Sequence, residues 1–358
     1  MDRRLLALAG LGIGLLALSP APADAAANCS RTSTGLLALP DLGAGTYRGE
    51  PGGLYPGGSN QPPAAYRQAG LQAAARVSPP AVLLSIGMSN ATQEFSAFAR
   101  AERADPQKAD SVLLVDGAQG GQTAAIWAAP GARTWTVVEQ RLQQAGAADG
   151  QVQAIWLKEA DAGPTGDELA YARRLEGELA AIVAIAAQRF PNLRQVFVSP
   201  RTYAGYATTA LNPEPYAYAS GFAVKWLVAD SVAHPDRRPW VGWGPYLWTD
   251  GTRGTGFQWT CSDAAADGTH PSPQGMEKVS RLLRDFFTGS PFTAWFGGRA
   301  APQGAAAPPP AAPRLPGWAP AAGVAGAGIL LVLGLSSLRR RRARGRASTP
   351  SPPAPGPG

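Results

Sequence analysis

Short apolar runs alternate with segments of helical periodicity through the middle of the chain. The runs are apolar over most of their length, as in strands of a parallel sheet that helices cover on both faces. The pattern therefore predicts a three-layer α/β/α domain around a five-stranded parallel sheet. The predicted strands are residues 81–88, 111–117, 152–158, 195–199 and 239–243, and the predicted helices are residues 64–75, 92–103, 134–145, 167–189, 215–233 and 273–287.

The N-terminal part of the chain has a different pattern. Two arginines precede an apolar stretch over residues 5–18, which is short for a membrane span, and small residues follow it. We interpret residues 1–27 as a secretory signal peptide, with an uncleaved anchor as the alternative. Residues 28–80 are rich in glycine, proline and alanine, and predict an extended lead-in that packs on the α/β domain of residues 81–298.

The C-terminal part predicts a membrane tether. Residues 299–320 form a linker rich in proline and alanine, which cannot bury a core. Residues 321–338 are uncharged and just long enough to span a membrane as a helix, and arginines follow them in the tail of residues 339–358. Because the positive-inside rule keeps such arginines in the cytoplasm, we predict an exported protein. A single C-terminal helix would anchor it in the lipid bilayer of the cell membrane, with the domain outside the cytoplasm. The helix and its arginines also resemble bacterial C-terminal sorting tails. The additional residues 347–358, which follow the arginines, do not fit that pattern.

The net charge of +7 arises mostly from this tail. Six arginines between residues 339 and 346 carry all but one of the seven charges, and no acidic residue follows residue 338. A basic chain can indicate a nucleic-acid partner, but the surplus here indicates membrane topology instead. We therefore expect no nucleic acid among the partners.

The chain has two cysteines, Cys29 and Cys261. Because disulfides persist outside the cytoplasm, we predict that they pair and tie the N-terminal segment to the loop before the last helix. Two free buried thiols are the alternative. Two cysteines and two histidines do not have the spacing of zinc ligands, so we predict no metal and no cofactor.

A candidate nucleophile follows the first predicted strand. That strand ends abruptly in Gly87-Met88-Ser89-Asn90, and a helix comes next. Open α/β sheets bind their ligands at the carboxyl ends of the strands, which places Ser89 where a reacting group is expected. Serine also caps helices, and this is the alternative role of Ser89.

A nucleophilic serine needs a base, and the chain has only two histidines. His234 ends a predicted helix in a charged stretch, where a surface role is expected. His270 lies in Asp267-Gly-Thr-His270, directly before the last helix. There Asp267 can accept a hydrogen bond from the imidazole Nδ1–H, so that Nε2 faces the serine. Ser89, His270 and Asp267 are therefore a candidate catalytic triad.

Together these segments resemble the SGNH/GDSL hydrolase family over residues 80–290. The resemblance rests on Gly87-x-Ser89-Asn90 after the first strand, on the glycine-rich turn after the second strand and on Asp267-x-x-His270 before the final helix. The Gly-x-Ser-Asn form is most similar to that of the carbohydrate acetylesterase branch. The resemblance implies an open parallel sheet of flavodoxin type with strand order 2-1-3-4-5, and ester hydrolysis without a metal.

The resemblance also implies an oxyanion hole made by the N–H of Ser89, a glycine N–H after the second strand and a side-chain amide after the third. We identify the glycine as Gly120, with Gly121 as the alternative donor and a plain tight turn as the alternative role. The third block departs from the family, because Trp156-Leu-Lys158-Glu159-Ala-Asp161 is one residue too short and puts Lys158 in place of the donor glutamine. Lys158 either stabilises the oxyanion by its charge or pairs with a neighbouring acid.

Four further residues are candidate substrate contacts. Asn90 is a polar residue after the first predicted strand, and Gln122 is a polar residue in the glycine-rich turn after the second. Either of them is an alternative third oxyanion donor. Trp243 and Trp259 belong to a group of tryptophans that crowd the stretch before His270. Exposed aromatic rings would suit stacking on sugar rings, and packing in the core is the alternative.

The sequence thus predicts a serine esterase, exported and tethered to the membrane, that acts on an acylated small molecule or glycan. By the family resemblance, the ester is an O-acetyl ester of a glycan. Two alternatives stay open. One is a non-catalytic surface protein that binds a glycan or another partner on the same fold, and the other is an O-acyltransferase that uses the same triad.

Overall fold

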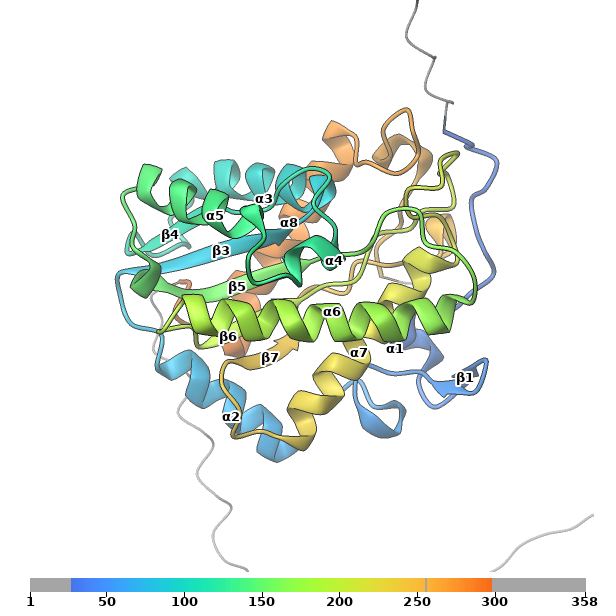
Figure 1. Cartoon of the computed structure of the whole chain (residues 1–358). Helices are drawn as coiled ribbons and strands as arrows, with labels where there is room; N and C mark the ends of the chain where they lie inside the picture. The colour runs from blue at the N-terminus through green and yellow to red at the C-terminus, as the bar shows by residue number, and fades with distance from the viewer. Residues whose placement is uncertain (1–26, 255, 298–358) are drawn as a thin grey trace, which may run out of the picture. The chain divides into compact units, whose positions relative to one another are not determined.

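A five-stranded parallel sheet forms the centre of the protein (Figure 1). The computed structural model describes residues 27–254 and 256–297. The strands lie in the order β4-β3-β5-β6-β7, which is 2-1-3-4-5 when these five are counted along the chain. The predicted fold class and strand order are therefore confirmed. The strands are β3 (Ala81–Gly87), β4 (Val112–Asp116), β5 (Val152–Lys158), β6 (Gln195–Val198) and β7 (Trp240–Trp243).

Helices cover both faces of this sheet (Figure 1). The chain moves from β3 outward to β4 and then back across the sheet, so right-handed connections place α3 on one face and the next helices on the other. Accordingly α3 packs against α8, and α6 packs against α7. The main helices are α2 (Ala64–Ala75), α3 (Ser89–Ala101), α5 (Arg133–Gln144), α6 (Glu168–Arg189), α7 (Tyr216–Ala233) and α8 (Pro273–Gly289).

The two central strands β3 and β5 are buried along their whole length. Every residue of both strands faces helices or neighbouring strands, which is why their sequences are apolar on both faces. Trp156 of β5 is fully buried and stacks on Phe95 of α3 with ring centroids 6.0 Å apart. This packing fixes α3 directly over the sheet.

The helix after β3 begins earlier than predicted. The sequence predicted a helix over residues 92–103 after a tight turn, but α3 spans Ser89–Ala101 because only Met88 stays extended (φ −84°, ψ −162°). The candidate nucleophile Ser89 is therefore the first residue of the helix. Its backbone N–H is one of those that lack an acceptor within the helix.

The short helix α4 (Ala124–Trp127) was not predicted. It follows the glycine-rich turn after β4, and it is too short to show a helical period in the sequence. Its first residue donates a backbone hydrogen bond of 3.1 Å to the carbonyl of Ala160, in the loop after β5. This contact ties together the loops after β4 and β5.

The N-terminal segment holds more structure than the extended lead-in that was predicted. It contains α1 (Leu39–Leu42), a hairpin of β1 (Thr46–Tyr47) and β2 (Glu50–Pro51), and the predicted helix α2. Leu39, Tyr55 and Tyr66 are buried in the main core. This segment therefore contributes core side chains.

The signal peptide, linker, transmembrane helix and basic tail that the sequence predicts lie outside the described residues. Within the described ranges, no helix is both long and apolar enough to cross a membrane. The membrane tether therefore stays a prediction from the sequence.

Candidate active site

The three candidate catalytic residues form one continuous chain of contacts. The Ser89 hydroxyl lies 2.7 Å from His270 Nε2, close enough to donate a hydrogen bond to it. On the other side of the ring, Nδ1 lies 2.5 Å from Asp267 Oδ2. Both side chains of the His–Asp pair are partly buried, with 27% of His270 and 21% of Asp267 exposed. The geometry brings together the three residues that the sequence singled out.

The second carboxylate oxygen of Asp267 fixes the backbone of the histidine loop. It accepts hydrogen bonds from the N–H of Thr269 (3.0 Å) and the N–H of His270 (2.9 Å). Burial opposes ionisation of Asp267, but these hydrogen bonds and the one from the His270 ring outweigh it, and the pKa of the carboxyl lies below its usual value. Asp267 is therefore an anion near neutral pH, as an orienting partner of His270 must be.

The histidine loop can close only because of a glycine. Gly268 has a φ of +69°, and a Cβ on it would lie 2.1 Å from the carbonyl oxygen of Tyr206. The loop is also pinned to α3, since the side-chain amide of Asn90 donates a 2.9 Å hydrogen bond to the carbonyl of Thr269. The helix that begins at Ser89 and the loop that carries His270 are thus held together directly.

Gly87 allows the chain to turn from β3 into α3. A Cβ at this position would lie 2.4 Å from the carbonyl oxygen of Lys158 and 2.3 Å from Ala91 Cβ. Any side chain would therefore push α3 away from the end of β5. This close approach explains the glycine of the Gly87-x-Ser89-Asn90 motif.

Two backbone N–H groups lie next to the nucleophile. A Cβ built on Gly120 would lie 3.9 Å from Ser89 Cβ, so the glycine turn after β4 comes next to the serine. Among the described residues, nothing accepts a hydrogen bond from the N–H of Gly120 or of Ser89. Both groups are therefore free to donate to a developing oxyanion, and we keep Ser89 and Gly120 as the candidate oxyanion donors.

Asp116, at the end of β4, organises this corner of the sheet, and the sequence analysis missed it. Its carboxylate accepts hydrogen bonds from Ser85 Oγ (2.6 Å), Ser96 Oγ (2.8 Å) and the N–H of Ala118 (3.2 Å). The hydroxyl of Thr92 donates to it as well. Asp116 thus ties β3, the first half of α3 and the glycine turn together.

The role predicted for Lys158 in the oxyanion hole is wrong. Its side chain has no exposed surface, and Nζ lies 2.6 Å from each carboxylate oxygen of Glu94, which is equally buried. Burial lowers the pKa of Lys158 to about 8, although Glu94 opposes this shift. The ammonium group is enclosed with its counter-ion and cannot reach a substrate.

Most of the candidate substrate contacts are also wrong. Trp243 and Trp259 are buried, and the indole N–H of Trp243 donates to the carbonyl of Leu54. Asn90 is 1% exposed, and its amide is used to hold the histidine loop. Gln122 is half-buried at the end of the glycine turn and stays a candidate.

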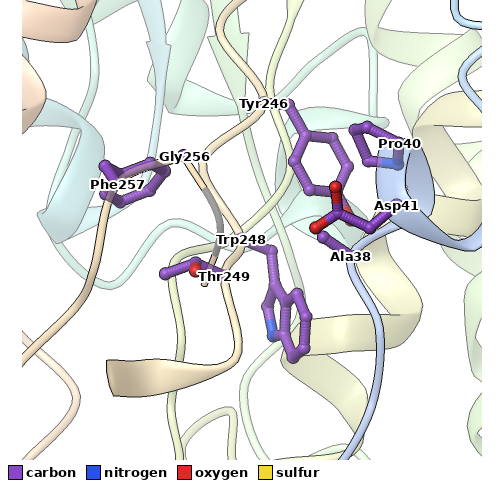
Figure 2. A pocket seen from close by; sticks show the side chains of 8 residues that line it. All are labelled: Ala38, Pro40, Asp41, Tyr246, Trp248, Thr249, Gly256 and Phe257. Atoms are coloured by element: carbon purple, nitrogen blue, oxygen red, sulfur yellow. The ribbon is translucent and has the colours of Figure 1, made fainter. Parts of the chain in front are cut away.

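A hollow of about 190 Å³ opens between α1 and the loop after β7 (Figure 2). The rings of Tyr246, Trp248 and Phe257 and the carboxylate of Asp41 line it. None of the three triad residues does. The hollow is therefore a feature separate from the candidate active site.

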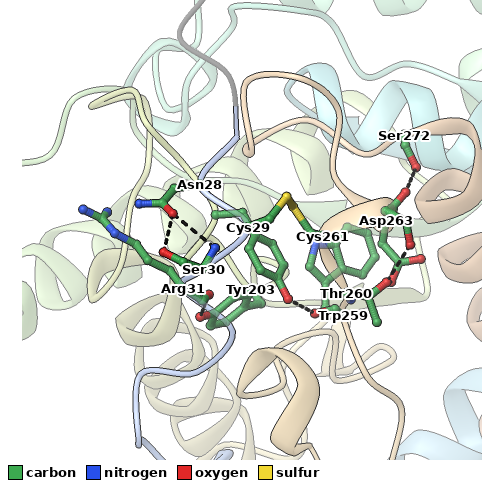
Figure 3. Close-up of a disulfide and its surroundings, with 12 residues drawn as sticks. Asn28, Cys29, Ser30, Arg31, Tyr203, Trp259, Thr260, Cys261, Asp263 and Ser272 are labelled. Carbon is green, nitrogen blue, oxygen red and sulfur yellow. Dashed lines mark hydrogen bonds between the residues drawn. A yellow bond between two sulfur atoms is a disulfide. The ribbon is translucent and has the colours of Figure 1, made fainter.

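The predicted disulfide between Cys29 and Cys261 is confirmed, and the two Cα atoms are 5.4 Å apart (Figure 3). It joins the N-terminal segment to the loop that leads to His270. Nearby, the Tyr203 hydroxyl donates a 2.7 Å hydrogen bond to the carbonyl of Arg31. The disulfide therefore anchors the beginning of the loop that carries the candidate base.

Within the described ranges, no group of three or more histidine, cysteine, aspartate or glutamate side chains is placed to hold a metal ion. The chemistry that the site offers is that of a serine next to a histidine and a carboxylate. Such an arrangement can transfer the serine proton to the imidazole and direct the serine oxygen at an electrophilic carbon.

No family model matches the chain, and no curated protein matches its sequence. An extracellular lipase from Streptomyces rimosus is similar in structure, with 13% identity over 57% of this chain and 99% of the lipase and a TM-score of 0.32. Phospholipase A1 from Streptomyces albidoflavus has 15% identity over 58% of this chain and 100% of the enzyme, with a TM-score of 0.30. At these scores, the likeness assigns neither a family nor an activity to this chain.

Proposed function

We propose that the protein is a serine ester hydrolase. The observation that carries the proposal is the continuous contact from Ser89 Oγ through the His270 ring to Asp267, with distances of 2.7 and 2.5 Å. A serine that merely capped α3 would bond to a backbone N–H of the first turn, and Ser89 makes no such bond. The carboxylate on the far side of the ring has no purpose in helix capping.

The geometry supports the following reaction sequence. Ser89 Oγ attacks the acyl carbon, its proton passes to His270 Nε2, and the carbonyl oxygen becomes an oxyanion beside the N–H groups of Ser89 and Gly120. When the carbonyl re-forms, the alcohol leaves with the proton from His270. A water molecule then repeats both steps and releases the acid. Asp267 stays ionised throughout and stabilises the imidazolium.

The finer parts of the proposal have separate support. An O-acetyl ester of a glycan is supported by the resemblance of the Gly87-x-Ser89-Asn90 motif to that of the carbohydrate acetylesterase branch. The tryptophans that suggested sugar stacking are buried and give no support to it. Export is supported by the N-terminal sequence and by the Cys29–Cys261 disulfide, because disulfides persist in oxidising compartments. Tethering to the membrane is supported by residues 321–346 of the sequence.

Turnover of a simple ester tests the proposal. We expect the purified full-length protein to release p-nitrophenol from p-nitrophenyl acetate over many cycles, and the Ser89→Ala variant, prepared in the same way, to show only background hydrolysis. The variant serves as the control for contaminating esterases. Equal rates for both proteins, or no turnover by either, would favour the alternative of a non-catalytic binding protein.

A further inference from the structure

Arg201 is a buried cation without a partner. The residue is 3% exposed, and its guanidinium makes no hydrogen bond or ion pair with any described residue. Its backbone is nevertheless held firmly, since its N–H donates a 2.9 Å hydrogen bond to Ser220 Oγ. A buried charge without a partner destabilises the fold, so such a group usually has a purpose other than stability.

The small part of Arg201 that is exposed to solvent lies at the tip of its side chain. Nε is fully enclosed and has no acceptor. The terminal nitrogens Nη1 and Nη2 also lack an acceptor among the described residues but are not enclosed in this way. The side chain is therefore packed along its stem and opens to solvent only through the part of the guanidinium that binds anions.

Strand order places Arg201 at the same edge of the sheet as the nucleophile. Gly87 of β3 is paired with Lys158 of β5, and Leu157 of β5 is paired with Val198 of β6. Ser89 and Arg201 follow the last paired residues of β3 and β6 by two and three residues, so both lie beyond the carboxyl edge of the sheet, on either side of β5. The ends of β3 and β6 are two strand spacings apart, or roughly 10 Å. An arginine side chain and an acyl group on Ser89 can together span this distance.

The groups around Arg201 leave its charge available. The nearby lysine, Lys158, is already neutralised by Glu94 at 2.6 Å. Glu214 is held by three donors, the N–H groups of Ala204 and Tyr218 and the indole of Trp248. Burial raises the pKa of Glu159 well above its usual value, which favours a neutral side chain there. Glu94, Glu159 and Glu214 interact electrostatically with Arg201, but no carboxylate in the described part of the chain lies within ion-pair distance of the guanidinium.

We propose that Arg201 is the third oxyanion donor, in place of the side-chain amide that the third block lacks. This proposal rests on the proposed esterase function. When Ser89 attacks, the C=O bond becomes C–O⁻ and the serine proton moves to His270; the guanidinium faces the new negative charge and stays protonated. When the carbonyl re-forms, the charge passes to the leaving alkoxide, which takes the proton from His270. Arg201 thus stabilises a charge that exists only in the transition state and the intermediate.

The test compares Arg201→Met with the wild type in the full-length protein. With p-nitrophenyl acetate as substrate, we expect kcat to fall about 10²–10³-fold, as for the loss of one oxyanion donor. KM should change by less than about threefold, since a charge absent from the ground state contributes little to substrate binding. The thermal midpoint should stay the same or rise, because the variant removes an unpaired buried charge.

Two further variants sharpen the test. Arg201→Lys keeps the charge without the planar fork, and we expect a kcat between those of the wild type and Arg201→Met. Arg194→Met alters an arginine just before β6, at the opposite end of the same strand, and we expect unchanged kcat. An unchanged kcat in Arg201→Met, or a fall in kcat together with a lower thermal midpoint, would overturn the assignment. If Ser89→Ala is as active as the wild type, it is the esterase function itself that fails.

Discussion

Replacing His270 with alanine lowers kcat for p-nitrophenyl acetate by about 10⁴-fold or more, because it removes the base that takes the Ser89 proton. His270 Nε2 is 2.7 Å from Ser89 Oγ, and only two histidines occur in the chain. Steady-state kinetics of the purified variant against the wild type measure the effect. The variant should fold normally, since its side chain is partly exposed at the surface.

The other histidine provides a matched control. His234 ends α7, with 46% of its side chain exposed, and its Nδ1 lies 2.9 Å from the carbonyl of Asp230. His234→Ala should leave kcat and KM at their wild-type values. Comparable losses in the two variants would show that histidine is needed for something other than general base catalysis, and full activity in His270→Ala would remove the triad from the account.

Replacing Lys158 with methionine lowers the free energy of unfolding by about 3–5 kcal/mol, because it leaves the Glu94 carboxylate buried without a counter-ion. Both side chains of this pair have no exposed surface. The pair joins α3, which begins at Ser89, to the carboxyl end of β5. Chemical denaturation of the wild type and the variant, compared by midpoint and slope, measures the loss.

The double variant Glu94→Met/Lys158→Met separates the pair from its surroundings. With both charges removed, the penalty for an unpaired charge disappears, and we expect most of the lost stability to return. A single Lys158→Met variant as stable as the wild type would contradict the buried pair. So would a double variant that is less stable than the single one.

The triad could be predicted because its parts are local in the sequence or scarce. Asp267 and His270 are three residues apart, so one loop brings them together whatever the rest of the fold does. Ser89 follows directly after a strand with a clear apolar run, two residues beyond its end. Apolar runs that are buried on both faces also specify a parallel sheet, which is why the strand segments were predicted nearly as the structure has them.

The surroundings of the triad could not be predicted, because they depend on which side chains meet across the sheet. No local pattern in the sequence pairs Lys158 with Glu94, which lies 64 residues earlier in the chain. A signal did exist: Glu94 lies in the same buried stripe of α3 as Ala91, Phe95 and Phe98, where a carboxylate needs a cation. The same reasoning could have singled out Arg201, a charged residue just after a buried strand.

The tryptophans show the limit of composition as a guide. Trp243 and Trp259 lie in a stretch rich in turns, which suggested a surface for sugars. In the structure the N-terminal segment packs over this region, and the indole N–H of Trp243 bonds to Leu54 of that segment. The cover comes from a part of the chain that carries few periodic signals, so it could not be predicted from the sequence.

The central claim is that Ser89 is a nucleophile activated by His270. The most direct measurement is the position of the adduct formed when the full-length protein reacts with a fluorophosphonate, located by mass spectrometry of its peptides. We predict one adduct, on Ser89, that is absent in Ser89→Ala and forms far more slowly in His270→Ala. A protein that stays unlabelled, or an adduct on any other residue, would contradict the account.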